Sequence, residues 1–164
     1  RLESLVNQYP LYSNADEALW LTADSYSRLG PRFLDRSVLA LSRIVKEVYS
    51  IEIIKPLGTE VAKIYRPLGL DNVHTRVGDG YFGWPEVNGG FDIIMVTCAA
   101  RYVSPELLKQ LKPEGRLIVP IGQPFKKGQV LYVFTKDKDG KVHSKKDMGV
   151  FFIPMTGKIM EQKS

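Results

Sequence analysis

The sequence VYSIE at residues 48–52 is a short apolar run that ends on an acid, and two later runs have a similar form. They are VGDGY at residues 77–81 and FDIIMVT at residues 91–97. Such runs predict strands of an open α/β sheet, in which ligands bind in the crevice beyond the carboxyl ends of the strands. An acid at one strand end suits ribose hydroxyls, and an Asp-Gly pair at the next suits an adenine ring. The pattern therefore predicts a nucleotide crevice bordered by Glu52, Asp79 and Thr97.

The segments around these runs alternate between helix and strand patterns. Helices are predicted over residues 37–46, from Pro56 to a break at Pro67 and Gly69, and from an N-cap at Ser104 to Leu111. In the second helix, Leu57, Val61, Ile64 and Tyr65 line one face. Strands are predicted over residues 48–54, 73–77, 91–97, 116–121, 130–135 and 150–154, with a hairpin turn at Asp139-Gly140.

The order of these segments predicts the fold class. Strands that alternate with helices and end in a hairpin indicate a doubly wound α/β sheet that is mainly parallel, with helices on both faces and an antiparallel edge. The run at residues 91–97 is apolar enough for a strand buried on both faces. We expect a single domain over residues 1–164, of which residues 1–36 are the least regular part.

The composition is typical of a soluble globular protein. The chain has 164 residues, of which 44% are hydrophobic and 25% are charged. It has neither the ~18–20 consecutive apolar residues of a membrane span nor an N-terminal secretory signal pattern. The one cysteine, Cys98, excludes an intrachain disulfide and a cysteine-rich metal site. We therefore expect a cytoplasmic protein that has no membrane partner and no metal.

The net charge of +5 raises the question of a nucleic-acid partner. Seven lysines and two aspartates, but no arginine, lie between Lys126 and Lys146. Proteins that bind single strands interleave arginine with stacking aromatic residues, and this stretch does not. The lysines therefore indicate a solvated face, and no nucleic-acid partner is expected.

From about residue 42 to residue 158, the chain resembles the protein-L-isoaspartate (D-aspartate) O-methyltransferases. Besides the three runs above, the matching motifs are LDNV at 70–73, GWPE at 83–86, LKPEGRLIVPIG at 111–122 and FIPMTG at 152–157. Each motif alone is weak, but together they occur in the family's order and at the family's spacing. The resemblance implies a Rossmann-like fold of the class I methyltransferase type.

The resemblance also implies an activity, a cofactor and a set of site residues. The activity is transfer of a methyl group from S-adenosylmethionine to the carboxylate of L-isoaspartyl and D-aspartyl residues in damaged proteins, by a monomeric enzyme. In this family pattern, Glu52 holds the cofactor ribose, and Asp79 and Gly80 lie at the adenine with Tyr81 beside them. Thr97, Cys98, Ala99 and Ala100 match the segment that lines the cofactor and accepts the substrate backbone.

The predicted chemistry needs no general base. A substrate carboxylate has a pKa of about 4 and is ionised at neutral pH, so no catalytic residue is singled out. His74 and His143 are expected to be structural or solvated, and Cys98 is better explained as a small buried apolar residue than as a nucleophile.

One family feature has no counterpart in this sequence. The family places a Gly-x-Gly-x-Gly loop ahead of the helix that ends near Ile44, where glycine lets the backbone approach the cofactor. Without gaps, the glycine slots hold Pro31, Phe33 and Asp35, and with a deletion only Arg36-Ser37 remains of the loop. The N-terminal part is thus truncated, diverged or altered by a sequence error. The alternative function is that of a non-catalytic methyltransferase-fold relative with weakened or lost cofactor binding.

Overall fold

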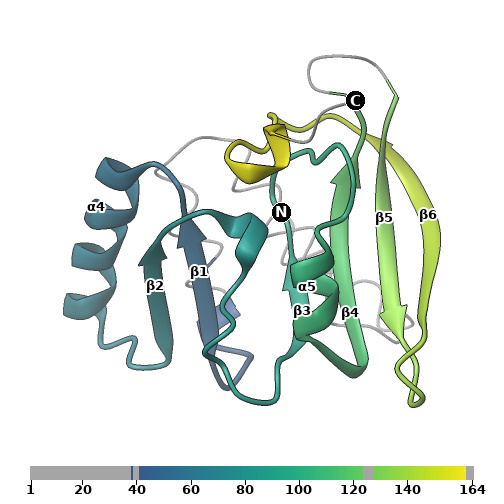
Figure 1. The fold of residues 1–164 in the computed structure, drawn as a ribbon. Helices are drawn as coiled ribbons and strands as arrows, with labels where there is room; N and C mark the ends of the chain where they lie inside the picture. The colour runs from purple at the N-terminus through teal and green to yellow at the C-terminus, as the bar shows by residue number, and fades with distance from the viewer. Residues whose placement is uncertain (1–37, 39–40, 124–127, 162–164) are drawn as a thin grey trace, which may run out of the picture. The chain divides into compact units, whose positions relative to one another are not determined.

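The computed structural model describes residue 38 and residues 41–123 and 128–161, and these fall into two compact units (Figure 1). The first unit belongs to residues 1–77 and the second to residues 78–164. Each unit has a sheet and a hydrophobic core of its own. The single domain expected over residues 1–164 stays a prediction, and the predictions for residues 1–36 lie outside the described residues.

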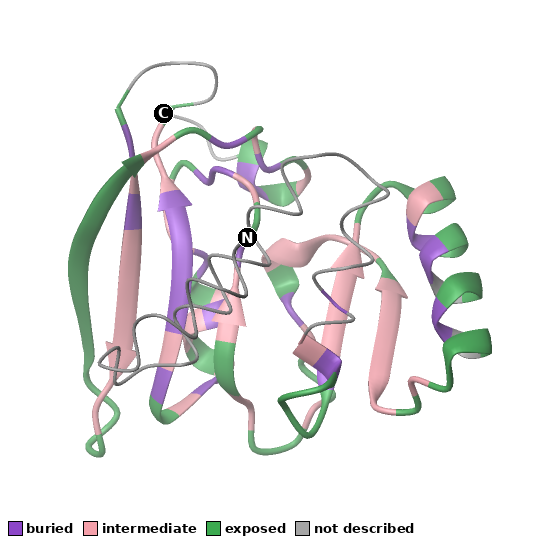
Figure 2. Ribbon diagram, turned by 180° about the vertical axis from the view of Figure 1, so that it is seen from behind, coloured by how far each residue is buried: buried purple, intermediate pink, exposed green. Residues whose placement is uncertain are grey.

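The first unit is a strand–helix–strand motif. Its elements are β1 (Val48–Glu52), α4 (Lys55–Tyr65), the 3-10 turn η1 (Arg66–Leu68) and β2 (Val73–Val77). β1 and β2 pair in parallel, and their register places Glu52 opposite Val77, so that both strands end at the same edge. α4 is the crossover helix that a parallel pair requires. One side of α4 is buried and the other is exposed (Figure 2).

Most predictions for this unit are confirmed, and the exceptions concern the end of β1, the burial of Ile64 and the helix predicted over residues 37–46. The strand at residues 73–77 has the predicted bounds, and α4 ends before Pro67 and Gly69, where Gly69 has a φ of 64°. β1 ends at Glu52 instead of residue 54, because the chain bends there to enter α4. Ile64 follows Val61 at helical spacing on the same face of α4, but it is 41% exposed and so lies at the solvent edge of that face.

The helix predicted over residues 37–46 ends earlier than its apolar pattern suggests. Residues 38, 41 and 42 are helical, and residues 43–46 form turns and bends. The side-chain amide of Asn72 donates hydrogen bonds to the carbonyl oxygens of Ser42 at 2.8 Å and Val45 at 3.2 Å. Asn72 thus satisfies carbonyl groups that the end of a helix leaves unpaired.

The second unit contains a four-stranded sheet in the order β3-β4-β5-β6. Its elements are η2 (Gly80–Phe82), β3 (Phe91–Met95), α5 (Pro105–Gln110), β4 (Leu111–Ile121), β5 (Gln129–Lys136), β6 (Val142–Val150) and η3 (Lys158–Met160). β3 and β4 pair in parallel, and α5 connects them in the sequence. The pairs β4–β5 and β5–β6 are antiparallel. β4 runs through the core, where Leu117 is fully buried (Figure 2).

The last strand lies elsewhere than predicted. β6 covers residues 142–150, whereas the prediction placed the final strand at residues 150–154. Within that segment, Val150 is the last residue of β6 and pairs with Gln129, and Pro154 forms an isolated bridge to Ala99. Nearly every residue of β6 is exposed (Figure 2), so its sequence lacks the apolar alternation by which strands are recognised.

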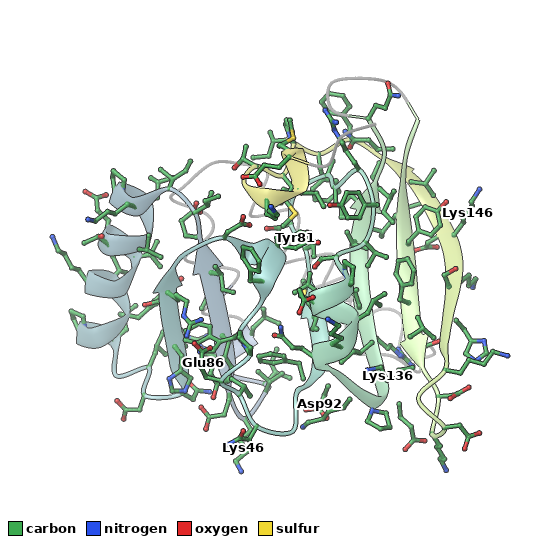
Figure 3. All side chains as sticks on the ribbon, viewed as in Figure 1. Lys46, Tyr81, Glu86, Asp92, Lys136 and Lys146 are labelled. Carbon is green, nitrogen blue, oxygen red and sulfur yellow. The ribbon has the colours of Figure 1, made fainter. Side chains whose placement is uncertain are left out.

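Three further elements of this unit differ from their predictions, and one of them is β4, which begins at Leu111 instead of residue 116. The strand at residues 91–97 ends at Met95, and burial on both faces is wrong because Ile93 is 42% exposed. Among the described strands, β3 is an edge strand. α5 begins at the predicted N-cap but ends at Gln110, where the ammonium of Lys136 donates to the carbonyl oxygen of Leu111 (Figure 3). A cation at this position suits the negative end of a helix.

The predicted fold class is confirmed. Two parallel strand pairs, each joined through a helix, are followed by the antiparallel β5–β6 hairpin, whose turn contains Asp139-Gly140 as predicted. The described strands form two sheets where one was expected. In the part of the chain that the structure describes, no helix has both the length and the apolar character needed to cross a membrane.

Candidate functional site

The loop that follows β2 carries three of the predicted site residues, and Asp79 organises it. Asp79 is the N-cap of η2, and its Oδ1 accepts the backbone N–H of Tyr81 at 2.9 Å. Its Oδ2 accepts the backbone N–H of Lys158 at 2.6 Å. The carboxylate therefore joins two segments that lie 79 positions apart in the sequence.

α5 holds the same loop from another direction. The Ser104 hydroxyl donates to the carbonyl oxygen of Tyr81 at 2.6 Å and accepts the N–H of Glu106 at 3.2 Å. The Gln110 side chain accepts the N–H of Trp84 at 2.7 Å and donates to the carbonyl oxygen of Phe82 at 2.8 Å. Residues 79–84 are here called the Asp79 loop. Each residue from 81 to 84 in this loop has at least one backbone group in a hydrogen bond.

The aromatic ring of Tyr81 lies among other side chains of the second unit (Figure 3). It makes edge-to-face contacts with Phe82, at 5.2 Å between ring centroids, and with Tyr102, at 6.4 Å. Loss of solvent raises the pKa of Tyr102 above its usual value of 10.0, and hydrogen bonding with the Tyr81 side chain raises it further. A hydrogen bond from Lys158 to Glu161 raises the pKa of the Lys158 ammonium. These contacts give the Asp79 loop an aromatic and polar surrounding.

Glu52 lies in the first unit, at the carboxyl end of β1 as predicted. Its Oε1 accepts the N–H of Ile54 at 2.8 Å, and the residue is half-buried. Gly58 of α4 packs close to this end of the sheet: a Cβ there would lie 2.8 Å from Val77 Cγ2 and 3.3 Å from Glu52 Cβ. The absence of a side chain at Gly58 therefore lets α4 approach the end of the strand that carries Glu52.

The segment predicted to accept the substrate is only partly accessible. Thr97 is exposed just beyond β3, and Cys98 is partly buried against the core. Ala99 and Ala100 are each 2% exposed, and their backbone groups are hydrogen-bonded to the segments at Ile153, Met155, Pro120 and Gly122. The structure thus places the two alanines in the core, and their role toward a substrate stays a prediction.

Three residues of the Asp79 loop's surroundings were not predicted. Gln110 and Lys158 act through nonlocal contacts for which the sequence has no local signal. Gly157 is part of the FIPMTG motif, whose glycine could have pointed to it. Among the described residues, no group of three or more His, Cys, Asp or Glu side chains could hold a metal ion.

Comparison with known proteins gives consistent results. A family model described as "Protein-L-isoaspartate(D-aspartate) O-methyltransferase (PCMT)" matches residues 37–160. The chain is 53% identical over 117 residues to protein-L-isoaspartate O-methyltransferase 1 of Nitrosospira multiformis, an alignment that covers 71% of this chain and 49% of the relative. It is 47% identical to protein-L-isoaspartate O-methyltransferase 2 of Syntrophobacter fumaroxidans, covering 71% of this chain and 47% of the relative. The chain spans about half the length of the curated relatives it matches.

Two solved structures share the fold. A protein-L-isoaspartate O-methyltransferase superimposes with a TM-score of 0.68 at 30% identity, covering 75% of this chain and 39% of that chain. A structure from Plasmodium falciparum, described as a protein-L-isoaspartate O-methyltransferase in complex with S-adenosyl-L-homocysteine, gives a TM-score of 0.55 at 29% identity. The second alignment covers 67% of this chain and 52% of that chain.

Proposed function

Because the chain belongs to the protein-L-isoaspartate(D-aspartate) O-methyltransferase family, we propose that it methylates the carboxylate of L-isoaspartyl and D-aspartyl residues in damaged proteins. S-adenosylmethionine is the methyl donor in this proposal. The observation that carries it is the family match over residues 37–160, which includes the ends of β1, β2 and β3. The α/β fold is of the class I methyltransferase type, as the solved relatives show.

The cofactor would be held by Glu52 at its ribose and by Asp79 and Gly80 at its adenine, with Tyr81 alongside. The Asp79 carboxylate uses one lone pair on each oxygen for a backbone N–H. A carboxylate has about four lone-pair positions, so it retains capacity to accept from a ligand amino group. Gly80 suits a close ligand approach, since the nearest atom to a Cβ there would be Met155 Cε at 3.7 Å. Thr97, exposed beyond β3, is assigned to the cofactor, and Cys98, which is partly exposed, is the most accessible of the residues assigned to the substrate.

The chain's own contribution to this chemistry is orientation. When bound, the cofactor supplies an activated methyl group, and the substrate carboxylate is ionised at neutral pH without a general base. Holding two reactants in the correct orientation can lower the activation barrier by on the order of 7–11 kcal/mol. The hydrogen bonds that fix the Asp79 loop serve this role by reducing the motion of Tyr81 and Gly80.

The partners follow from the reaction. We propose that the substrates are proteins and peptides with isoaspartyl residues, and that the enzyme acts as a monomer in the reducing cytoplasm. The single cysteine supports that compartment. The lysines of β6 are exposed and are assigned to the solvated surface.

The test is methyl incorporation into an isoaspartyl peptide and into its aspartyl twin, which differ only in the site of the peptide linkage. We expect label in the isoaspartyl peptide and background label in the twin. Equal labelling of both would reject the repair assignment. No labelling of either, together with no binding of S-adenosylhomocysteine, would favour the non-catalytic relative.

A further inference from the structure

We infer that Lys158 is a positioning residue, whose backbone N–H holds the Asp79 carboxylate and thereby sets the geometry of the Asp79 loop and its affinity for the cofactor. This rests on the proposed function, in which Asp79 contacts the adenine. The contact is direct: the N–H of Lys158 donates to Asp79 Oδ2 at 2.6 Å. The other carboxylate oxygen accepts the N–H of Tyr81, so the two contacts together orient the side chain.

The chain reaches Asp79 in a conformation that requires glycine. Gly157 has a φ of 92°, a backbone angle that residues other than glycine rarely adopt. The nearest atoms to a Cβ at Gly157 would be those of the Asp79 carboxylate, at distances that no real Cβ contact has. Gly157 is thus the residue that lets the backbone come close enough for Lys158 to donate.

The segment that carries Lys158 is anchored in the core and can act as a fixed support. Met155 is 7% exposed and Ile159 is 1% exposed, so buried side chains lie on both sides of Gly157 and Lys158. The N–H of Met155 also donates to the carbonyl oxygen of Ala99 at 2.8 Å. A donor on such a support restrains Asp79, whereas a donor on a free tail would move with it.

The role belongs to the backbone of Lys158 and not to its ammonium. The ammonium points to a different partner, Glu161, at 2.6 Å. The N–H can be removed by Lys158→Pro, because Lys158 is the first residue of η3, a position where proline is tolerated. Lys158→Ala removes the ammonium but keeps the N–H. The comparison between these two variants therefore isolates one hydrogen bond.

The first readout is independent of any ligand. Hydrogen exchange of the Tyr81 amide, which donates to Asp79 Oδ1, is expected to be faster in Lys158→Pro than in Lys158→Ala. Amides of β4 and β5 serve as internal controls and should exchange alike in both variants. Equal exchange of the Tyr81 amide in the two variants would overturn the inference, whether or not the protein binds the cofactor.

The second readout is cofactor affinity. S-adenosylhomocysteine is expected to bind about tenfold more weakly to Lys158→Pro than to Lys158→Ala, the order expected for one hydrogen bond to a charged group. The KM for S-adenosylmethionine should rise, while kcat at saturation is retained. In a double-mutant cycle, Lys158→Pro and Asp79→Ala together should lose less affinity for S-adenosylhomocysteine than the sum of their separate losses, because both changes act through the Asp79 carboxylate. Additive losses would overturn the inference, whereas a wild-type protein that does not bind the ligand would overturn the proposed function.

Discussion

The buried side chain of Gln129 hydrogen-bonds to both backbone polar groups of Phe152: its Oε1 accepts the N–H at 2.6 Å and its Nε2 donates to the carbonyl oxygen at 3.1 Å. Gln129 is 1% exposed, at the start of β5, and Phe152 is also buried. At Phe152, the segment after β6 is therefore held by a side chain, and just beyond Phe152 it is held by backbone hydrogen bonds with Ala99.

Replacing Gln129 with leucine should destabilise the protein strongly. The change replaces a polar side chain with an apolar one of similar size and removes its two hydrogen bonds to the Phe152 backbone, at about 1–3 kcal/mol for each buried group. Urea unfolding of Gln129→Leu measures the loss. The matched control is Gln123→Leu at an exposed position, which should change stability by no more than about 0.5 kcal/mol. Equal stability of the two variants would contradict the role assigned to Gln129.

Gly83→Ala should disturb the Asp79 loop. Gly83 has a φ of 62° and a ψ of −141°, and a Cβ there would collide with the side-chain amide of Gln110. Backbone strain of this kind costs on the order of 1–3 kcal/mol, and the hydrogen bonds that Gln110 donates to Phe82 and accepts from Trp84 should weaken. Gly149→Ala, where a Cβ meets nothing within 4 Å, is the control. Thermal unfolding that ranks Gly149→Ala as the more damaging change would refute this account of the loop.

The β5–β6 hairpin should contribute a pH-dependent part of the stability. Asp137 Oδ1 accepts the N–H groups of Asp139 and Lys141, and its Oδ2 contacts His143 Nε2 at 2.8 Å. The hydrogen bond with His143 lowers the pKa of Asp137 below its usual 3.8, and the Lys141 N–H lowers it further. Because the pKa in the folded state is the lower one, the stabilisation is complete above the unfolded value and is lost as pH falls through the folded value.

This dependence can be measured against Asp137→Asn, which keeps an oxygen acceptor for the turn but has no carboxylate to titrate. The difference in unfolding free energy between the wild type and this variant should shrink as the pH falls below 3.8. A difference that stays constant from neutral pH into the acid range would show that the Asp137 carboxylate does not contribute in this way.

Substitutions at the proposed cofactor site should rank differently from a substitution at a distant histidine. Glu52→Ala and Asp79→Ala should each weaken S-adenosylhomocysteine binding by about tenfold or more, since each removes a charged hydrogen-bonding group. His143→Ala, on the exposed strand β6, should leave the affinity unchanged. Isothermal titration measures all three, and the reverse ranking would place the site elsewhere.

Local patterns predicted the elements that are defined by local chemistry. The N-cap at Ser104 and the break at Pro67 and Gly69 are confirmed because capping and turn formation depend on neighbouring residues. Glu52 at the end of β1 and Asp79 just after β2 also follow from the strand pattern.

The remaining features depend on contacts that a local pattern does not contain. β6 is exposed along its length and is held by pairing with β5, so its polar sequence has no strand periodicity. From the sequence alone, the polar residue Gln129 would be assigned to the surface. Its burial follows from its hydrogen bond with Phe152, which lies 23 positions away in the sequence. The contact between Asp79 and Lys158 spans 79 positions and decides how the Asp79 loop is held. Residues of this kind can be identified only once the chain is folded.

Binding of S-adenosylhomocysteine, followed as a thermal shift of the full chain, tests the central claim most directly. A ligand that binds only the folded state stabilises it by about 2.7 kcal/mol at 100 times its Kd, and each kcal/mol raises the Tm by about 2–4 °C in a chain of this size. We predict a rise in Tm that grows with ligand concentration and is reduced in Glu52→Ala. The absence of any shift at millimolar ligand would contradict the account.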